Sequence, residues 1–433
     1  MKSFFISLLF GFFIVPAFAQ DDIYPAPKQS GIIAITNATV HVGNGQVLEN
    51  ATVIITDGKI AAVGNNVTVP AGATSINAQG KQVYPGLILT NTNLGLVEVP
   101  SVRATSDVQE LGELNPNVRS IVAYNTDSKI INVLRANGIL LANIVPEGGV
   151  ISGSSSVVQL DAWNAEDAMY KTDAGIHFRM PPLLPRPRAA TASQAQPDPV
   201  KQGLEQVDRA KAFFREAAAY NATTDHDVQN LKFAAVKGLY DKSKKLYVHA
   251  NTVKQMLVAL DFVNEFHFDV VIVGGSDSWQ IAGLLKQNNV AVILNQMHDL
   301  PTLPDDAVDQ PYKTPAQLQQ AGVLFAINDA DGQTRGRNLP FNAGTAAAYG
   351  LSKEQALQAI TLNAAKIIGI SDRTGSIEVG KDANLIISTG DILDMRTSNV
   401  TDAFIQGRKI DLNNKQKQLA ERYRQKYGLS ISF

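Results

Sequence analysis

The sequence predicts an α/β protein in which a (β/α)8 barrel of the TIM type stands beside a small β-sandwich. From residue 86 onward, short and nearly continuous apolar segments alternate with amphipathic helical segments. That alternation is typical of parallel strands joined by crossover helices. Residues 31–80 instead alternate β-branched and polar side chains around tight-turn glycines at 43–45 and 57–58. This second pattern predicts a meander of hairpins.

The barrel strands are predicted from apolar segments that are too short for core helices. Seven segments qualify, namely GLILTN, GILLANIV, SSVVQL, KLYVHAN, DVVIVGG, VAVILNQ and GVLFAIND. Helical periodicity separates several of them, in residues 126–138, 253–266, 279–289 and 314–322. Because these units extend over about 290 residues, a closed barrel fits better than an open doubly wound sheet. No G-x-G-x-x-G motif follows a strand, so dinucleotide binding has no support.

The remaining segments divide the chain into domains. Strand patterns in 20–85 and 376–412 are expected to join in one composite β-sandwich, leaving 86–375 for the barrel. Residues 180–200 are rich in proline and predict an extended surface insertion. Residues 413–433 read as a charged helix and tail.

The N-terminus has the pattern of an export signal. Lys2 precedes an apolar stretch over residues 4–15, and Ala17-Phe18-Ala19 forms a small-x-small cleavage motif. The stretch is short for a membrane span, so we expect a signal peptide at residues 1–19 and a periplasmic or secreted mature chain. No membrane attachment is expected after cleavage.

Composition excludes several classes of function. The chain has no cysteine, which removes disulfides, thiolate metal sites and thiol nucleophiles. A formal net charge of −2 gives no electrostatic reason to expect nucleic acid as a partner. Only six histidines could serve as nitrogen ligands.

Four segments carry a family resemblance. The segment VYPGLI closes the meander, VHAN and IVGGSD lie in the barrel, and GLSKEQALQAITLNAAKIIGISDRTGSIEVGKDANLII lies near the end. Together they resemble the amidohydrolase superfamily, in particular its imidazolonepropionase-like branch. The resemblance implies a barrel whose strand ends hold one or two divalent metals, and hydrolysis of a non-peptide carbon–nitrogen bond.

The ligand positions that the resemblance implies are mostly replaced in this chain. The H-x-H pair of the first strand falls on Asn91 and Asn93, and the lysine of the fourth strand falls on Gln159. The fifth-strand histidine matches His249, followed at the next family position by Asn251. The sixth-strand histidine falls on Gly274, and the catalytic aspartate matches Asp329.

Neutral amides and a glycine are poor ligands for zinc-like ions. We therefore expect no cofactor and no binuclear metal centre, and a pocket that keeps polar character. The leading hypothesis is a non-catalytic homologue that binds a small polar molecule at the barrel mouth or a partner protein, such as an active amidohydrolase relative.

Two catalytic alternatives stay open. His249, His298 and Asp329 could hold one relocated divalent metal such as zinc, with an open coordination position. Alternatively, His249 could act without metal as a base oriented by Asp329, on a cyclic amide or dipeptide-like substrate. His177, which borders the proline-rich insertion, is interpreted as structural.

Overall fold

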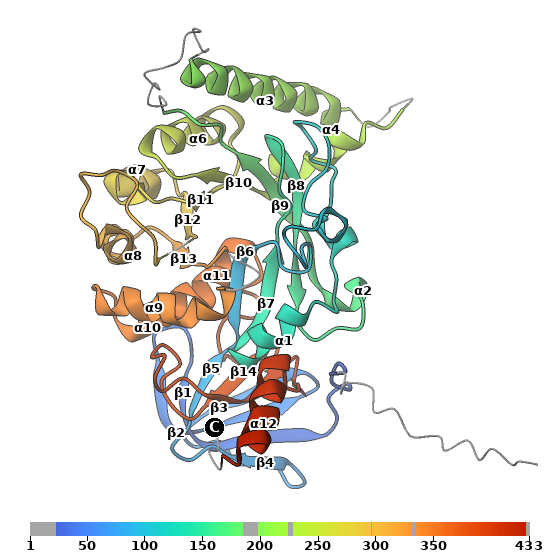
Figure 1. Ribbon diagram of the computed structural model, residues 1–433, viewed down its shortest axis with the longest axis vertical. Coiled ribbons are helices and arrows are strands. Elements are labelled where there is room, and N and C mark those ends of the chain that lie inside the picture. The colour runs from blue at the N-terminus through green and yellow to red at the C-terminus, as the bar shows by residue number, and fades with distance from the viewer. Residues whose placement is uncertain (1–22, 185–197, 224–227, 296, 331–334, 430–433) are drawn as a thin grey trace, which may run out of the picture.

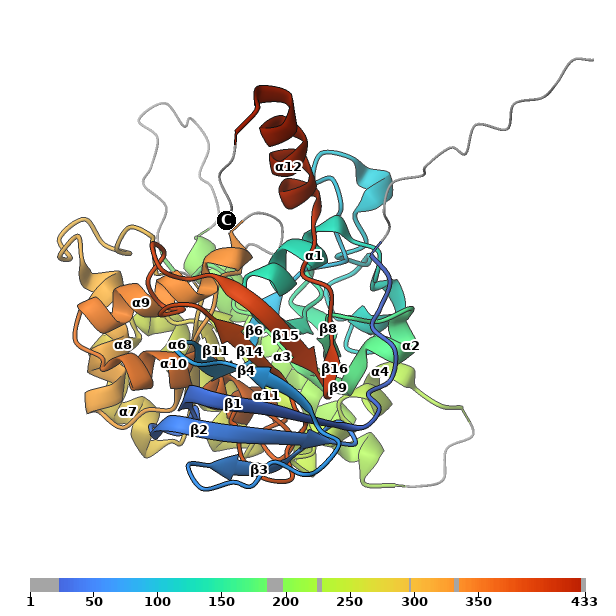
Figure 2. The same ribbon diagram turned by 90° about the horizontal axis from the view of Figure 1, so that it is seen from below.

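The computed structural model describes residues 23–184, 198–223, 228–295, 297–330 and 335–429 (Figure 1). The predicted signal peptide and most of the proline-rich insertion lie outside these residues. Two sheets of eight strands each organise the described chain. In Figure 2, seen from the side of the first sheet, that sheet lies across one flank of the barrel.

The first sheet combines strands from both ends of the chain. Its hydrogen-bonded order is β16-β15-β14-β5-β1-β2-β3, with β4 also paired to β1. The N-terminal strands are β1 (Ile32–His41), β2 (Val47–Thr56), β3 (Lys59–Gly64), β4 (Thr74–Asn77) and β5 (Gln82–Pro85). The C-terminal strands are β14 (Leu385–Ser388), β15 (Val400–Ile405) and β16 (Arg408–Lys409). Because β14 pairs with β5, the two ends of the chain share one buried apolar cluster.

The second sheet is a nearly closed eight-stranded barrel, as predicted. Its order runs from β13 to β6 without interruption. The strands are β6 (Leu87–Thr92), β7 (Ile139–Ile144), β8 (Ile151–Gln159), β9 (Met169–Arg179), β10 (Lys245–Ala250), β11 (Val270–Gly274), β12 (Ala291–Leu294) and β13 (Phe325–Ile327). Their apolar side chains belong to the larger buried cluster of the molecule.

The direction of β8 and the existence of β9 differ from the prediction. Strand β8 is antiparallel to both β7 and β9, whereas all other barrel pairs are parallel. Only residues 145–150 connect β7 to β8, which is too short for a crossover helix. Gly148 and Gly149 in this connection have φ of +82° and +62°, as a tight reversal requires. Strand β9 escaped prediction because Lys171 and Asp173 interrupt its apolar pattern.

Helices surround the barrel. They are α1 (Lys129–Ala136), α2 (Ala165–Ala168), α3 (Pro199–Asn221), α4 (Leu231–Ala235), α5 (Lys237–Tyr240), α6 (Val253–Phe266), α7 (Ala282–Gln287), α8 (Gln310–Gln320), α9 (Leu339–Ala348), α10 (Lys353–Ala359) and α11 (Leu362–Ile368). Short 3-10 turns are η1 (Arg103–Thr105), η2 (Ser120–Ala123), η3 (Ser278–Ile281) and η4 (Gly336–Asn338). Helix α6 begins at a capping box, in which Thr252 and Gln255 satisfy each other's backbone amides.

The last helix, α12 (Lys415–Tyr427), buries none of its side chains and projects from the body in Figure 2. Within the described ranges, no helix combines the length and the apolar character that crossing a membrane would require.

A buried carboxylate joins the barrel to the first sheet. Asp161, which follows β8 and is 1% exposed, pairs with Arg135 of α1 and with Arg408 of β16. Its second oxygen also accepts a hydrogen bond from the backbone N–H of Ala26, at 2.9 Å. Three distant parts of the sequence therefore meet at one side chain.

Candidate functional site

The carboxyl-terminal ends of the parallel barrel strands form one end of the barrel, which we call the barrel mouth. On its first strand, Asn91 lies in a network with Asn295 after β12 and Asn328 after β13. The Asn328 Oδ1 atom accepts hydrogen bonds from the backbone N–H groups of Thr90 and Asn91, at 2.8 and 3.2 Å. The Asn328 Nδ2 group donates to the Asn91 carbonyl at 2.8 Å and to Asn295 Oδ1 at 3.4 Å.

This network fixes the orientation of the Asn91 amide. The backbone N–H groups require the Asn328 oxygen on their side, so the Asn328 nitrogen faces Asn295 and requires an oxygen there. Asn295 Oδ1 then accepts the second bond from Asn91 Nδ2 at 3.2 Å. The Asn91 Oδ1 atom is left as a buried acceptor without a hydrogen-bond partner among the described residues. Such an atom is costly to bury unless a donor reaches it.

The second asparagine of the first strand is held differently. Asn93 Nδ2 donates to Glu147 Oε1 at 3.2 Å, and its own Oδ1 is again buried without a partner in the described chain. Nearby, Arg179 at the end of β9 donates to Ser152 Oγ at 3.1 Å and to the Pro146 carbonyl at 3.2 Å. Burial lowers the pKa of the Arg179 guanidinium, and the charge of Glu147 partly opposes that effect.

Two histidines meet inside the barrel. His177 Nδ1 lies 2.9 Å from His249 Nε2, and the His177 ring also stacks on Tyr247 at a centroid distance of 4.8 Å. His177 is fully buried, and its Nε2 has no partner among the described residues. Burial, followed by the charge of Arg179, lowers the pKa of both histidines well below the ordinary value. The pair is therefore neutral at physiological pH.

His249 is not oriented by Asp329. The side-chain hydrogen bond of His249 runs to His177, while Asp329 Oδ2 accepts from Asn342 Nδ2 of α9 at 3.2 Å. The predicted base-and-orienter arrangement of His249 and Asp329 is thus not formed in this structure.

At Gly274, the end of β11 leaves no room for a side chain. Its φ is +105°, and a Cβ atom there would lie 2.3 Å from Asn251 Oδ1. That oxygen is held in place by the Ser276 hydroxyl at 3.2 Å. Asn251 therefore occupies the space into which a histidine at position 274 would extend.

His298 lies apart from the barrel interior. It is exposed, its Nε2 lies 2.8 Å from Thr345 Oγ1 of α9, and its ring contacts Tyr312 edge-on. The predicted grouping of His249, His298 and Asp329 is not brought together.

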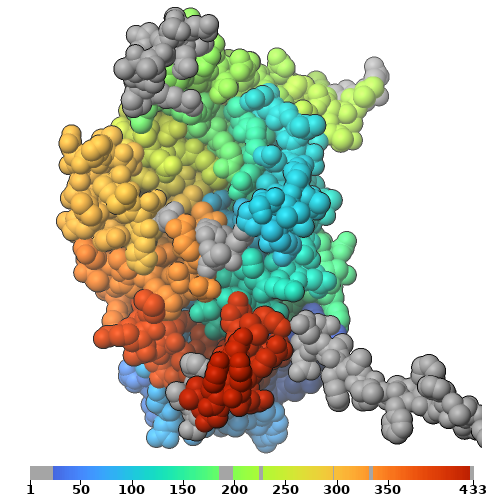
Figure 3. Space-filling view, in the orientation of Figure 1, coloured from blue at the N-terminus to red at the C-terminus, as the bar shows by residue number. Residues whose placement is uncertain are grey.

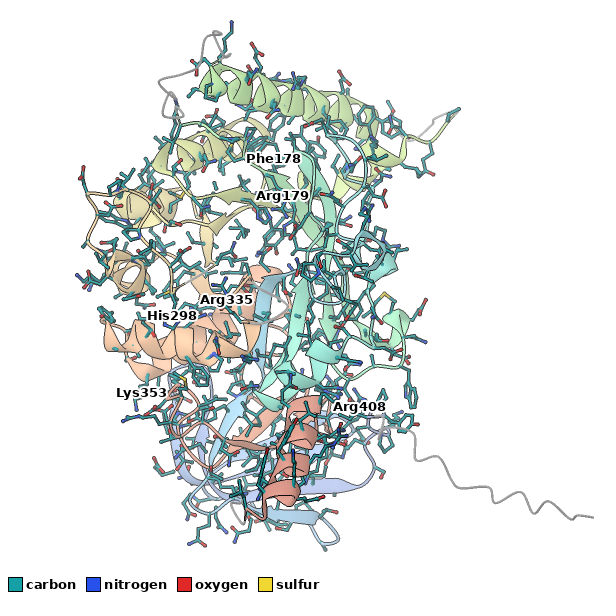
Figure 4. The ribbon with its side chains drawn as sticks, in the orientation of Figure 1. Phe178, Arg179, His298, Arg335, Lys353 and Arg408 are labelled. Carbon is teal, nitrogen blue, oxygen red and sulfur yellow. The ribbon has the colours of Figure 1, made fainter. Side chains whose placement is uncertain are left out.

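Gln159 lies at the end of the barrel opposite the mouth. Because β8 runs backwards, Gln159 pairs with Leu141 near the start of β7. Its amide bonds Asp161 and the carbonyl of Asp167, and its oxygen accepts from Arg408 at 3.2 Å. Figure 4 shows Arg408 on the sheet side of the molecule, far from Arg179. The assignment of Gln159 to the family's lysine position is wrong for this geometric reason, and β9 supplies the neighbour of β10.

The residues of the mouth do not fit the binuclear metal centre that the family resemblance implies. Among the described residues, no three of His, Asp and Glu lie close enough to hold a metal ion. Asn91, Asn93, Asn251 and Asn295 offer only neutral amide groups, most of them engaged with one another or with Glu147.

A cavity of about 220 Å³ adjoins the mouth. Asn251, Gly274 and Asn295 form its wall on the side of the barrel strands, and α8 with the preceding loop forms the opposite wall. Figure 3 shows this face, where residues 95–125 (cyan) and the segment from β12 to α8 (yellow to orange) lie on opposite sides of the mouth.

Comparisons with known proteins agree with this architecture. Residues 304–410 match the sequence pattern of the amidohydrolase family. The imidazolonepropionase of Mesorhizobium japonicum is 23% identical over 367 residues, covering 79% of this chain and 87% of the relative. That of Thermoplasma volcanium is 23% identical over 379 residues, covering 82% and 89%.

Solved structures show the same fold. An amidohydrolase from Thermotoga maritima superimposes with a TM-score of 0.76 at 24% identity, over 88% of this chain and 99% of its own. A prolidase complexed with N-methylphosphonate-L-proline superimposes with a TM-score of 0.53 at 16% identity, over 88% and 100%. Barrel and flanking sheet together define an amidohydrolase-type α/β barrel. Within that class, the chain is similar to the amidohydrolase superfamily, and in particular to its imidazolonepropionases.

Sequence reasoning missed three polar residues of the mouth, namely Arg179, Asn295 and Asn328, and interpreted His177 as structural. Asn295 and Asn328 each follow directly on a buried apolar strand, and that position could have identified them. His177 and Arg179 could not be placed without β9.

Proposed function

We propose that this protein is exported and binds a small polar molecule at the barrel mouth, without the binuclear metal centre of its superfamily. The observation that carries the proposal is the fixed amide of Asn91. At a position where the family resemblance implies a histidine ligand, it uses its nitrogen within the protein and leaves an oxygen acceptor for another molecule.

The other family positions support the same conclusion. Asn93 is held by Glu147, and Gly274 is closed by Asn251. His249 is paired with a second neutral histidine in place of a metal or of Asp329. These contacts form an ordered polar network, which is the environment that positions a ligand with several hydrogen-bonding groups.

Metal content tests the proposal. Protein expressed with its full N-terminus in medium supplemented with zinc and manganese, and purified without chelators, is expected to hold far less than one metal ion per chain. The same sample should begin at Gln20 by mass spectrometry if the signal peptide is removed after Ala19.

The variant His249→Ala serves as the comparison, because His249 is the histidine that matches a family ligand. Its residual metal content should equal that of the wild type. Near-stoichiometric metal in the wild type that disappears in His249→Ala would overturn the metal-free part of the proposal.

A further inference from the structure

The cavity beside the mouth is strongly one-sided in charge. Asp277, Asp299 and Asp306 line it, and among the described lining residues none is Lys, Arg or His. Asp277 is 4% exposed. Burial raises its pKa, the neighbouring Asp306 raises it further, and contacts with Thr302 and the Val253 amide lower it. Among the described lining residues, no basic group compensates this carboxylate pair.

The same cavity has an apolar and aromatic side. Trp279, Leu294, Met297, Pro301 and Pro311 contribute to its lining. The Trp279 Nε1 atom is buried and has no hydrogen-bond partner among the described residues. An indole beside carboxylates favours a cation carried on an apolar body.

The polar network of the mouth points to a donor as well. Asn295 lines the cavity and accepts from Asn91, whose own oxygen is fixed as a partnerless acceptor. Asn91 is 7% exposed and does not itself line the cavity, so its acceptor calls for an N–H group in the mouth next to the cavity.

We propose that this cavity binds a small molecule with a protonated amine on an apolar body, the amine lying between Asp277 and Asp306 and the body against Trp279. This inference goes beyond the proposed function, since the cavity adjoins the mouth but is not lined by Asn91. Carboxylates on the cavity wall would repel an anionic ligand of the same size.

The two tryptophans of the chain provide a local signal. Trp279 lies in the cavity, whereas Trp163 lies after β8, 62% exposed and beside Tyr24. In the variant Trp163→Phe, the tryptophan fluorescence therefore reports on Trp279 alone. We would titrate this variant at about pH 7.5 with benzylamine, which is protonated there, and with the neutral benzyl alcohol and the anionic benzoate.

Benzylamine should change the Trp279 fluorescence in a saturable way and bind more tightly than the other two probes. Adding Asp306→Asn should weaken benzylamine by about tenfold and leave benzyl alcohol unchanged, because one charge is removed at constant volume. Asp305→Asn is the matched control, since Asp305 is exposed and does not line the cavity. It should behave like the parent.

The outcomes separate the two proposals. If benzyl alcohol or benzoate binds as tightly as benzylamine, the amine preference is refuted while a ligand site at the mouth remains. The same holds if Asp306→Asn has no effect on benzylamine. If no probe changes the Trp279 fluorescence, the proposal of an amine site in this cavity fails, whereas the ligand proposed at Asn91 is unaffected.

Discussion

At the scale of single residues, the space available to each side chain decides which residues the mouth can hold. Asn251 Oδ1 lies where a side chain at position 274 would begin, and the backbone of Gly274 has a φ that side chains rarely adopt. Placing a histidine at Gly274 would therefore strain the backbone and displace Asn251. Histidines at Asn91 and Asn93 alone would leave a metal site incomplete.

Gly274→Ala should lower the free energy of unfolding by about 1–3 kcal/mol, because it combines a positive φ with a clash against Asn251. Urea denaturation of the purified variant measures this difference. The control is Gly283→Ala in α7, where a Cβ atom meets nothing within 4 Å, and this variant should be neutral or slightly stabilised.

A second variant separates the two causes. Combining Gly274→Ala with Asn251→Ala removes the clash but keeps the backbone strain, so the double variant should lose less than the sum of the two single effects. If Gly274→Ala were as stable as the wild type, the close approach of Asn251 would be of no energetic consequence.

At the scale of elements, the barrel is closed by a side chain. Seven of the eight joins between neighbouring strands are backbone ladders, whereas β6 and β13 are not paired in the sheet. Asn328 bridges this seam through the backbone groups of Thr90 and Asn91. The Asn328 side chain thus connects β13 to β6 by hydrogen bonds, as backbone hydrogen bonds connect the other neighbouring strands.

Asn328→Ala should therefore destabilise the protein by about 2–4 kcal/mol, since two buried backbone N–H groups lose their acceptor. The shift in the midpoint of chemical denaturation is the appropriate measurement. Asn65→Ala is a suitable control, because Asn65 is exposed and makes one hydrogen bond to the Glu49 carbonyl. Equal stability of the two variants would show that the seam does not depend on Asn328.

The positions of most strands could be predicted from the sequence, but their directions could not. Apolar segments such as VVIVG located most strands, because continuous burial leaves a strong signal. The direction of β8 is set by the length of the loop before it, and Lys171 and Asp173 hid β9. Because the reversed direction of β8 was not predicted, Gln159 was expected at the wrong end of the barrel.

At the scale of the whole molecule, the histidine pair links stability to pH. Unfolded histidines have a pKa of about 6.5, whereas burial lowers the pKa of folded His177 and His249 well below it. The unfolded chain thus takes up protons first as the pH falls. Their contribution to stability is complete above about pH 6.5 and is lost progressively below it.

We expect the free energy of unfolding to fall between about pH 7 and pH 5, by up to about 1.4 kcal/mol per pH unit for each additional proton bound by the unfolded chain. His249→Gln should reduce this slope, and His298→Gln, which changes an exposed side chain outside the pair, should not. His41 acts in the opposite sense. Burial lowers its pKa, but Glu354 and Gln82 raise it by more, so only the difference between variants isolates the pair. If the slope were unchanged in His249→Gln, the pH dependence of stability would not arise from the His177–His249 pair.

The residues of the candidate site could partly be predicted from sequence, because family position and strand order identify His249, Asn91 and Asp329. The contacts among these side chains could not be predicted from the sequence. The His177–His249 contact depends on β9, and the orientation of Asn91 depends on a chain of three amides from three strands.

The carboxylate of Asp161 also has a consequence for the order of events during synthesis. It joins Ala26, near the beginning of the chain, to Arg408, near its end, across sequence separations of 135 and 247 residues. Contacts this distant form late, since the intervening loop must close first. Barrel strands that are close in sequence can pair early, but this joint cannot form until Arg408 is present. A chain truncated before Arg408 would lack the Asp161–Arg408 ion pair, and Asp161 would keep only Arg135 as an arginine partner.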